Sequence, residues 1–175
     1  LYPDLGSLID CFRRRGLTSF LVTNGTKPNA LAGLATEPTQ LYVTVAAPSE
    51  GIYQGVCNPL VKDGWKSLKA TLDILSSFSC PTVIRLTLAK GLNMLMPEAY
   101  SKLILSSEAT YVEAKAYMHV GYSTGRMGFQ NMPSHGEIAA FALELSRLTG
   151  YSLIDQQRES RVALLSRLEK PIRLG

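Results

Sequence analysis

Segments with a strand pattern alternate with segments with a helix pattern along this sequence of 175 residues, and no other feature limits the fold as much. The strand patterns are rich in Val, Ile, Thr and Tyr and occupy residues 18–25, 40–48, 81–91, 111–118 and 160–166. Helix patterns with apolar residues three and four apart occupy residues 4–12, part of 26–38, 63–75, a stretch from 97, and 134–145. Strands that alternate with helices form parallel sheets through right-handed crossovers, so the sequence predicts an α/β sheet or barrel.

Three of the predicted strands carry polar side chains on only one face. Arg85 and Thr87 share a face because successive side chains of a strand alternate in direction, and so do Glu113 and Lys115. Thr44 has the same position on a third strand. A sheet covered by helices on both faces would have continuous apolar strands, so the pattern favours a barrel or partial barrel with a polar interior. Arg85, Glu113 and Lys115 would line a site there, or would form an internal ion-pair network.

The composition is that of a globular protein with 46% hydrophobic residues and a net charge of +4. The length predicts one domain over residues 1–175, and no membrane partner is expected because no apolar run approaches the length of a membrane span. A cytoplasmic location is expected because the cysteines show no secretory disulfide pattern. The sequence starts at Leu1 in a helical pattern, which suggests the middle of a longer protein. The cysteines have no metal-clip spacing and lie far apart, at Cys11, Cys57 and Cys80.

Several short motifs suggest a ligand site at the ends of the strands. Asn24 and Gly25 follow a strand at its carboxyl end, where α/β folds bind ligands, although Asn-Gly is also a common turn. The glycine-rich residues 121–128 lack the pattern of a phosphate loop and are predicted to form a flexible loop over the barrel mouth. His119 lies just after a strand and is a candidate pocket residue. No Glu or Cys stands at ligand spacing from His119 or His135, so no metal site is expected.

Lys115 is the candidate covalent nucleophile of the chain. If Arg85 is its neighbour on the adjacent strand, the lysine would lose its proton more easily and could form a Schiff base with a keto substrate. No Ser-His-Asp or Cys-His set can be assembled, so hydrolysis is not predicted.

Six ordered sequence blocks resemble the tRNA 4-demethylwyosine synthase family of radical S-adenosylmethionine enzymes, in its archaeal form. The blocks are SFLVTNGT, TQLYVTVAAP, NPLVKDGW, TVIRLTLAKGLNM, VEAKAYMHVGYS and NMPSH, and the similarity extends from Leu1 to about Leu165. It implies a TIM-like partial (βα)6 barrel of the radical S-adenosylmethionine type, of which this chain would hold the C-terminal strands, roughly three to six, and their helices. It also implies that two carbons of pyruvate are joined to N1-methylguanosine next to the tRNA anticodon.

The resemblance implies S-adenosylmethionine and [4Fe–4S] clusters as cofactors, and an electron donor for cluster reduction. The family's Cys-x3-Cys-x2-Cys motif precedes the part that this chain resembles, so we expect no cluster ligands here and no activity from this chain alone. A monomer is expected.

The resemblance also suggests roles for individual polar residues. Residues at successive strand ends are expected along the adenosylmethionine site, namely Asn24, Thr44, Arg85 and Thr87. Two residues are expected to be catalytic and to face the substrates, Glu113 and Lys115, with Lys115 in contact with pyruvate. Further substrate-binding candidates, for pyruvate or for tRNA, are Lys90, His119 and Arg126.

Two alternatives stay open from the residues alone. A class I aldolase-like lyase would use a barrel lysine as a Schiff base without any cluster. A non-catalytic RNA-binding fragment would use only the basic surface, which includes Arg13 to Arg15.

Overall fold

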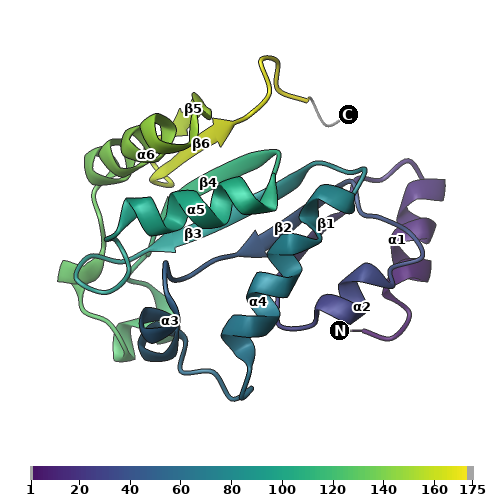
Figure 1. Cartoon of the computed structure of the whole chain (residues 1–175), viewed down its shortest axis with the longest axis horizontal. Helices are drawn as coiled ribbons and strands as arrows, with labels where there is room; N and C mark the ends of the chain where they lie inside the picture. Colours follow the sequence, from purple (N-terminus) through teal and green to yellow (C-terminus); the bar gives the residue numbers. More distant parts are fainter. Residues whose placement is uncertain (1, 173–175) are drawn as a thin grey trace.

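A computed structural model describes residues 2–172 as one sheet with helices packed on one of its faces (Figure 1). Within these residues the strands are β1 (Phe20–Thr23), β2 (Gln40–Thr44), β3 (Thr82–Leu88), β4 (Tyr111–Ala116), β5 (Ser152–Gln157) and β6 (Val162–Ser166). The α-helices are α1 (Leu5–Arg14), α2 (Pro28–Ala32), α3 (Glu50–Cys57), α4 (Gly64–Asp73), α5 (Pro97–Ser107) and α6 (His135–Thr149). Short 3-10 helices follow α4 at Leu75–Ser77 and follow β4 at Gly121–Gly125 and Phe129–Asn131.

The strand order of the sheet is β1-β2-β3-β4-β6-β5. Strands β1 to β4 are parallel and follow one another in sequence, which confirms the predicted α/β arrangement. The last part of the sheet differs from the prediction that every strand is parallel, because β6 runs antiparallel to β4 and forms a hairpin with β5. No helix separates β5 from β6, so the chain reverses direction without a crossover.

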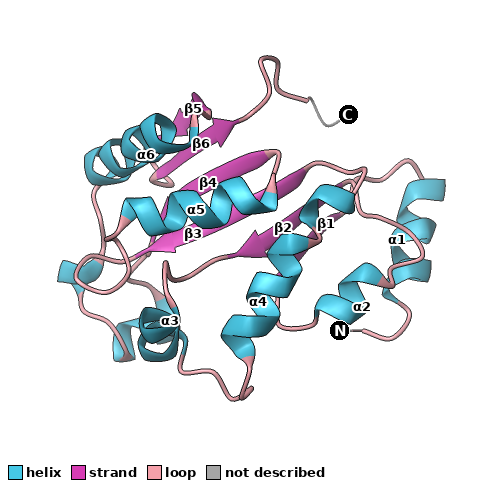
Figure 2. Ribbon diagram, viewed as in Figure 1, coloured by secondary structure: helices cyan, strands magenta, loops and turns pink. Residues whose placement is uncertain are grey.

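Helices α4, α5 and α6 lie in a row over one face of the sheet, as Figure 2 shows. The strand side chains on this face form the core with the helices, and Val43, Leu86 and Ala114 are completely buried there. This burial confirms the predicted alternation, in which these residues oppose the polar face. Helix α6 starts with a capping box, in which Ser134 Oγ accepts a hydrogen bond from Glu137 N.

The sequence patterns missed α3 and β5. Helix α3 has two glycines within eight residues, so its helical pattern is weak. Strand β5 lies at the sheet edge and is mostly exposed, with the sequence SLIDQQ, so it lacks the apolar alternation of a half-buried strand.

The second face of the sheet carries the polar residues and is called the open face below. Tyr42, Thr44, Arg85, Glu113 and Lys115 lie on this face by their register. It also includes Phe20 and Val22 of β1, which are 53% and 52% exposed. None of the helices in residues 2–172 is both long and apolar enough to cross a membrane.

Candidate functional site

The loops that follow β1, β2, β3 and β4 all leave the carboxyl edge of the parallel strands, and the polar candidates gather there and on the adjoining open face. The turn after β1 is fixed by two local hydrogen bonds, in which Asn24 Oδ1 accepts from the backbone N–H and from the hydroxyl of Thr26. Gly25 has a φ of +72°, and a Cβ at this position would lie 2.7 Å from Leu68 Cδ1. The Asn-Gly pair therefore forms the turn that packs this edge against α4, and it also presents Asn24 to the adjoining cavity.

A cavity of about 490 Å³ lies between the carboxyl ends of β1 and β2 and the α3–α4 loop. Its walls include Asn24 and Thr44, together with the apolar side chains of Leu60 and Val61. A second hollow of about 470 Å³ shares Asn24 and Thr44 and reaches Lys27. Mostly apolar walls with a few polar groups suit a small organic ligand. The structure thus brings together two residues that the family resemblance implies for the adenosylmethionine site.

Arg85 and Glu113 form a two-point ion pair across β3 and β4. Arg85 Nε donates to Glu113 Oε1 at 2.7 Å and Nη2 donates to Oε2 at 3.2 Å. The guanidinium also lies over Tyr42, with Cζ 4.5 Å from the ring centroid. Burial and the Glu113 carboxylate raise the pKa of Tyr42. The predicted ion-pair network is therefore present for this pair, and it holds both charges on the open face.

Lys115 is not part of that network. Its cross-strand neighbours are Thr87 on β3 and Val162 on β6, whereas Arg85 lies opposite Glu113. The prediction that Arg85 is the strand neighbour of Lys115 is therefore wrong. Lys115 is half-buried and, within residues 2–172, forms no ion pair.

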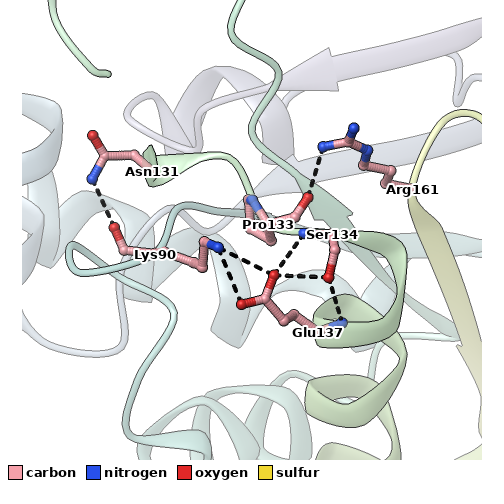
Figure 3. A network of polar contacts seen from close by, with 6 residues as sticks. All are labelled: Lys90, Asn131, Pro133, Ser134, Glu137 and Arg161. Carbon is pink, nitrogen blue, oxygen red and sulfur yellow. Dashed lines mark hydrogen bonds and ion pairs between the residues drawn. The ribbon is translucent and has the colours of Figure 1, made fainter. Parts of the chain in front are cut away.

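Lys90 stands in a different environment, which Figure 3 shows. Its Nζ lies 3.2 Å from Glu137 Oε1, and its backbone N–H donates to the carbonyl oxygen of Asn131. The Asn131 amide donates in return to the Lys90 carbonyl oxygen at 2.9 Å. Glu137 Oε2 also accepts from the backbone N–H and the hydroxyl of Ser134. These two hydrogen bonds from Ser134 lower the pKa of Glu137, and Lys90 lowers it by a smaller amount. Through these contacts Lys90 links the loop after β4 to the end of β3.

The loop after β4 contains two more of the predicted substrate-binding residues. His119 is half-buried, and its Nδ1 lies 3.1 Å from the hydroxyl of Tyr117. Arg126 is exposed between the two 3-10 helices. Residues 121–128 were predicted to be a flexible loop, but the structure shows a 3-10 helix at Gly121–Gly125.

Asn93 positions the carboxyl edge and was not singled out from the sequence. Its buried amide donates to the carbonyl oxygens of Ala46 and Thr87 at 2.7 and 2.9 Å, and its Oδ1 accepts from Ala89 N at 2.6 Å. One side chain therefore joins the ends of β2 and β3. The only sequence signal is an asparagine within the turn-rich GLNM.

The described residues do not fit a metal cluster. No group of three or more His, Cys, Asp and Glu side chains in residues 2–172 could hold a metal ion. The cysteine thiols are all unpaired with one another, and burial beside Glu37 raises the pKa of Cys80 to about 12, which does not favour a thiolate ligand.

The fold and the site together define an α/β protein whose parallel strands present a ligand cavity and a charged open face. The family described as wyosine base formation matches residues 106–167. An S-adenosyl-L-methionine-dependent tRNA 4-demethylwyosine synthase from Pyrococcus abyssi is 47% identical over 171 residues, which are 95% of this chain and 50% of the relative. The chain is similar to this synthase over nearly its whole length, and it spans about half the length of the relative.

Two solved structures extend the comparison. A structure described as TYW1 with a lysine-pyruvate adduct bound superposes with a TM-score of 0.87 and 36% identity, and it covers 98% of this chain and 54% of that one. Coproporphyrinogen III oxidase from Escherichia coli, described as a radical SAM enzyme, superposes with a TM-score of 0.57 at 13% identity over 95% of this chain and 40% of that one. At this identity the second likeness concerns the fold alone.

Proposed function

We propose that this chain is the substrate-facing part of a tRNA 4-demethylwyosine synthase, which condenses carbons of pyruvate with N1-methylguanosine next to the tRNA anticodon. The observation that carries the proposal is the 47% identity to a relative of that name, together with a structure in which polar groups converge at the carboxyl edge. An aldolase-like lyase and a non-catalytic RNA-binding protein are less well supported, because the similar proteins are named as synthases.

The sheet would form one domain and one part of a TIM-like partial barrel, with the open face toward the barrel interior. Support comes from the exposed apolar side chains of β1, Phe20 and Val22, and from the unpaired outer edge of that strand in the part of the chain that the structure describes. Parallel sheets are rarely left uncovered on one face. The remainder of a full-length protein would supply the cover.

The cavity at Asn24 and Thr44 fits the nucleoside part of S-adenosylmethionine. An adenine ring would pack against the apolar walls near Leu60 and Val61, while the amide of Asn24 and the hydroxyl of Thr44 are able to bond polar atoms of the ligand. Arg85 and Thr87 would continue this polar surface along β3. Bound there, the cofactor would supply the radical that removes hydrogen from the methyl group of the base.

The two charged residues of β4 would have different tasks. Glu113 would keep Arg85 in place through its two hydrogen bonds. Lys115 would hold the carboxylate of pyruvate as an ammonium group, since it has no ion-pair partner within residues 2–172. The cluster ligands would lie in the rest of the full-length protein, which would act in the cytoplasm as a monomer with an electron donor.

The experiment that tests the function uses the full-length protein with reconstituted clusters, S-adenosylmethionine, pyruvate, a reductant and tRNA that contains N1-methylguanosine. We expect the tricyclic base in digested tRNA, detected by mass spectrometry, and incorporation of label from pyruvate. Cys57 lines the cavity, so S-adenosylhomocysteine should also slow its alkylation but not that of Cys11. An active enzyme without protection of Cys57 would contradict the cofactor site, and tRNA that remains unmodified would contradict the function.

A further inference from the structure

The loop between β4 and α6 exposes large apolar side chains beside the carboxyl edge. Tyr122 is 99% exposed and Phe129 is 67% exposed. Each ring therefore leaves most of its surface to solvent, which costs free energy unless something covers it in another state.

Phe129 is the outer end of a row of rings that starts at the end of β4. Tyr117 is buried, and its hydroxyl lies 3.1 Å from His119 Nδ1. His119 in turn packs against Phe129 with 6.1 Å between ring centroids and an interplanar angle of 88°. The His119 backbone N–H also donates to the sulfur of Met132. These contacts hold the Phe129 ring on the side of His119, and the rest of the ring is exposed to solvent.

Polar contacts from Lys90, Glu137 and Arg161 hold the end of this loop in place, as Figure 3 shows. Lys90 and Asn131 exchange two hydrogen bonds that involve both backbones. Arg161 Nη1 donates to the Pro133 carbonyl oxygen at 2.9 Å, and Glu137 binds both Lys90 and Ser134. A surface that is held in place before binding loses less conformational entropy when a ligand arrives.

The charge of the segment favours an anionic partner. Residues 116–136 contain no Asp or Glu, and Arg126 is exposed among them. Lys115 precedes the segment, and the first carboxylate after it, Glu137, is paired with Lys90. Exposed rings and an exposed cation in one short segment that has no carboxylate are the combination that single-stranded nucleic acids bind.

We propose that Phe129, supported by His119, is a stacking surface for an unpaired nucleobase of RNA, with Arg126 near the phosphate backbone and Tyr122 as a second ring. The inference rests on the proposed function in that the RNA is the anticodon loop of tRNA. It adds the segment and the side chains that bind the loop while the neighbouring base enters the site.

The test compares Phe129→Ala, Phe129→Leu and Phe129→Trp in the full-length protein. The probes are a synthetic anticodon stem-loop RNA with N1-methylguanosine and a fully paired duplex of similar length, and the affinity is measured by fluorescence anisotropy. Leu143→Ala is the matched control, because Leu143 is 56% exposed on α6. Circular dichroism and thermal unfolding check that each variant folds.

Loss of the ring should weaken stem-loop binding about 5- to 100-fold for Ala and Leu, whereas Trp should bind within about threefold of the native protein. Binding of the duplex and binding by Leu143→Ala should not change. Arg126→Gln should lower the salt dependence of binding, and Phe129→Ala should not.

The proposal is wrong if Phe129→Ala binds the stem-loop with native affinity, or if its binding of stem-loop and duplex is weakened equally. The exposed ring would then be a contact for a protein partner. The proposed function is judged separately by formation of the tricyclic base in the native protein. If the native protein makes no product but Phe129→Ala still loses stem-loop affinity, the proposed function is wrong. The stacking surface is then still supported.

Discussion

Lys115 and Arg85 lie on the same face of the sheet, but their charges are compensated differently. Arg85 has a two-point partner in Glu113 and a ring beneath it, so its charge is fixed within the protein. Lys115 lies opposite Thr87, and within residues 2–172 it has no ion pair. A half-buried lysine without a carboxylate partner in the described part of the chain suits an anionic substrate.

For Lys115, we expect the substitution by Ala to lower formation of the tricyclic base in the full-length enzyme about 10- to 100-fold, since a charge-assisted contact is lost. Lys115→Arg should keep a large part of the activity because the positive charge remains. Product is measured by mass spectrometry of digested tRNA. Lys69→Ala, on the exposed face of α4, is the control.

Borohydride trapping separates the two possible roles of Lys115. If the lysine acts through its charge, a trapped pyruvate adduct should map to another lysine of the full-length protein. An adduct on Lys115 itself, together with an inactive Lys115→Arg variant, would show that it is the Schiff-base residue. Native rates in Lys115→Ala would exclude both roles.

At the scale of single elements, the amino terminus of α6 depends on Glu137. The hydrogen bonds from Ser134 lower the pKa of this carboxyl, and Lys90 adds a smaller effect. A lowered pKa in the folded state means that Glu137 stabilises the fold above its unfolded pKa, and that this contribution disappears as the pH falls through the folded value. The glutamate therefore links the helix cap and the loop to pH.

We expect Glu137→Gln to lower the free energy of unfolding at pH 7 and to have no effect at acidic pH, where the native carboxyl is protonated in both states. Urea unfolding of the native and variant proteins between neutral and acidic pH measures this difference. Glu98→Gln, an exposed substitution near the start of α5, is the control. A difference that is the same at every pH would contradict the prediction.

Asn93 joins two strands, and its replacement should affect the fold more than that of an exposed asparagine. Asn93→Ala removes three hydrogen bonds and leaves the buried backbone groups of Ala46, Thr87 and Ala89 without this partner. We expect a loss of about 2–4 kcal/mol in the free energy of unfolding. Asn29→Ala on the exposed side of α2 should change it little. Similar unfolding midpoints for both variants would contradict the assigned role.

These elements also show what could be predicted from the sequence. The alternation of polar and apolar residues was enough to place Arg85, Glu113 and Lys115 on one face, because the period of a strand is local. The pairing of Arg85 with Glu113 rather than Lys115 depends on the register between strands, which the crossover connections determine. The contacts of Asn93 and the antiparallel β5–β6 hairpin are likewise tertiary features, so no local pattern revealed them.

At the scale of the whole molecule, the two faces of the sheet are unequal. Helices α4, α5 and α6 lie over one face, as Figure 1 shows, whereas the open face exposes Phe20 and Val22 at its β1 side. A parallel sheet with an exposed apolar edge strand is prone to association unless another part of the protein covers it. The proposed barrel would provide that cover in the full-length protein.

The cover can be measured with two cysteine substitutions of nearly equal exposure in this structure. Val22 is 52% exposed on the open face, and Leu143 is 56% exposed on the outer side of α6. In the full-length protein we expect Val22→Cys to react with a maleimide about 10-fold or more slowly than Leu143→Cys, because buried thiols are inaccessible to the reagent. Peptide mass spectrometry distinguishes each site from the native cysteines. After denaturation in urea both should react at the same rate, which controls for intrinsic reactivity. Equal rates in the folded protein would mean that nothing covers β1, and the barrel would have to be abandoned in favour of an open sheet.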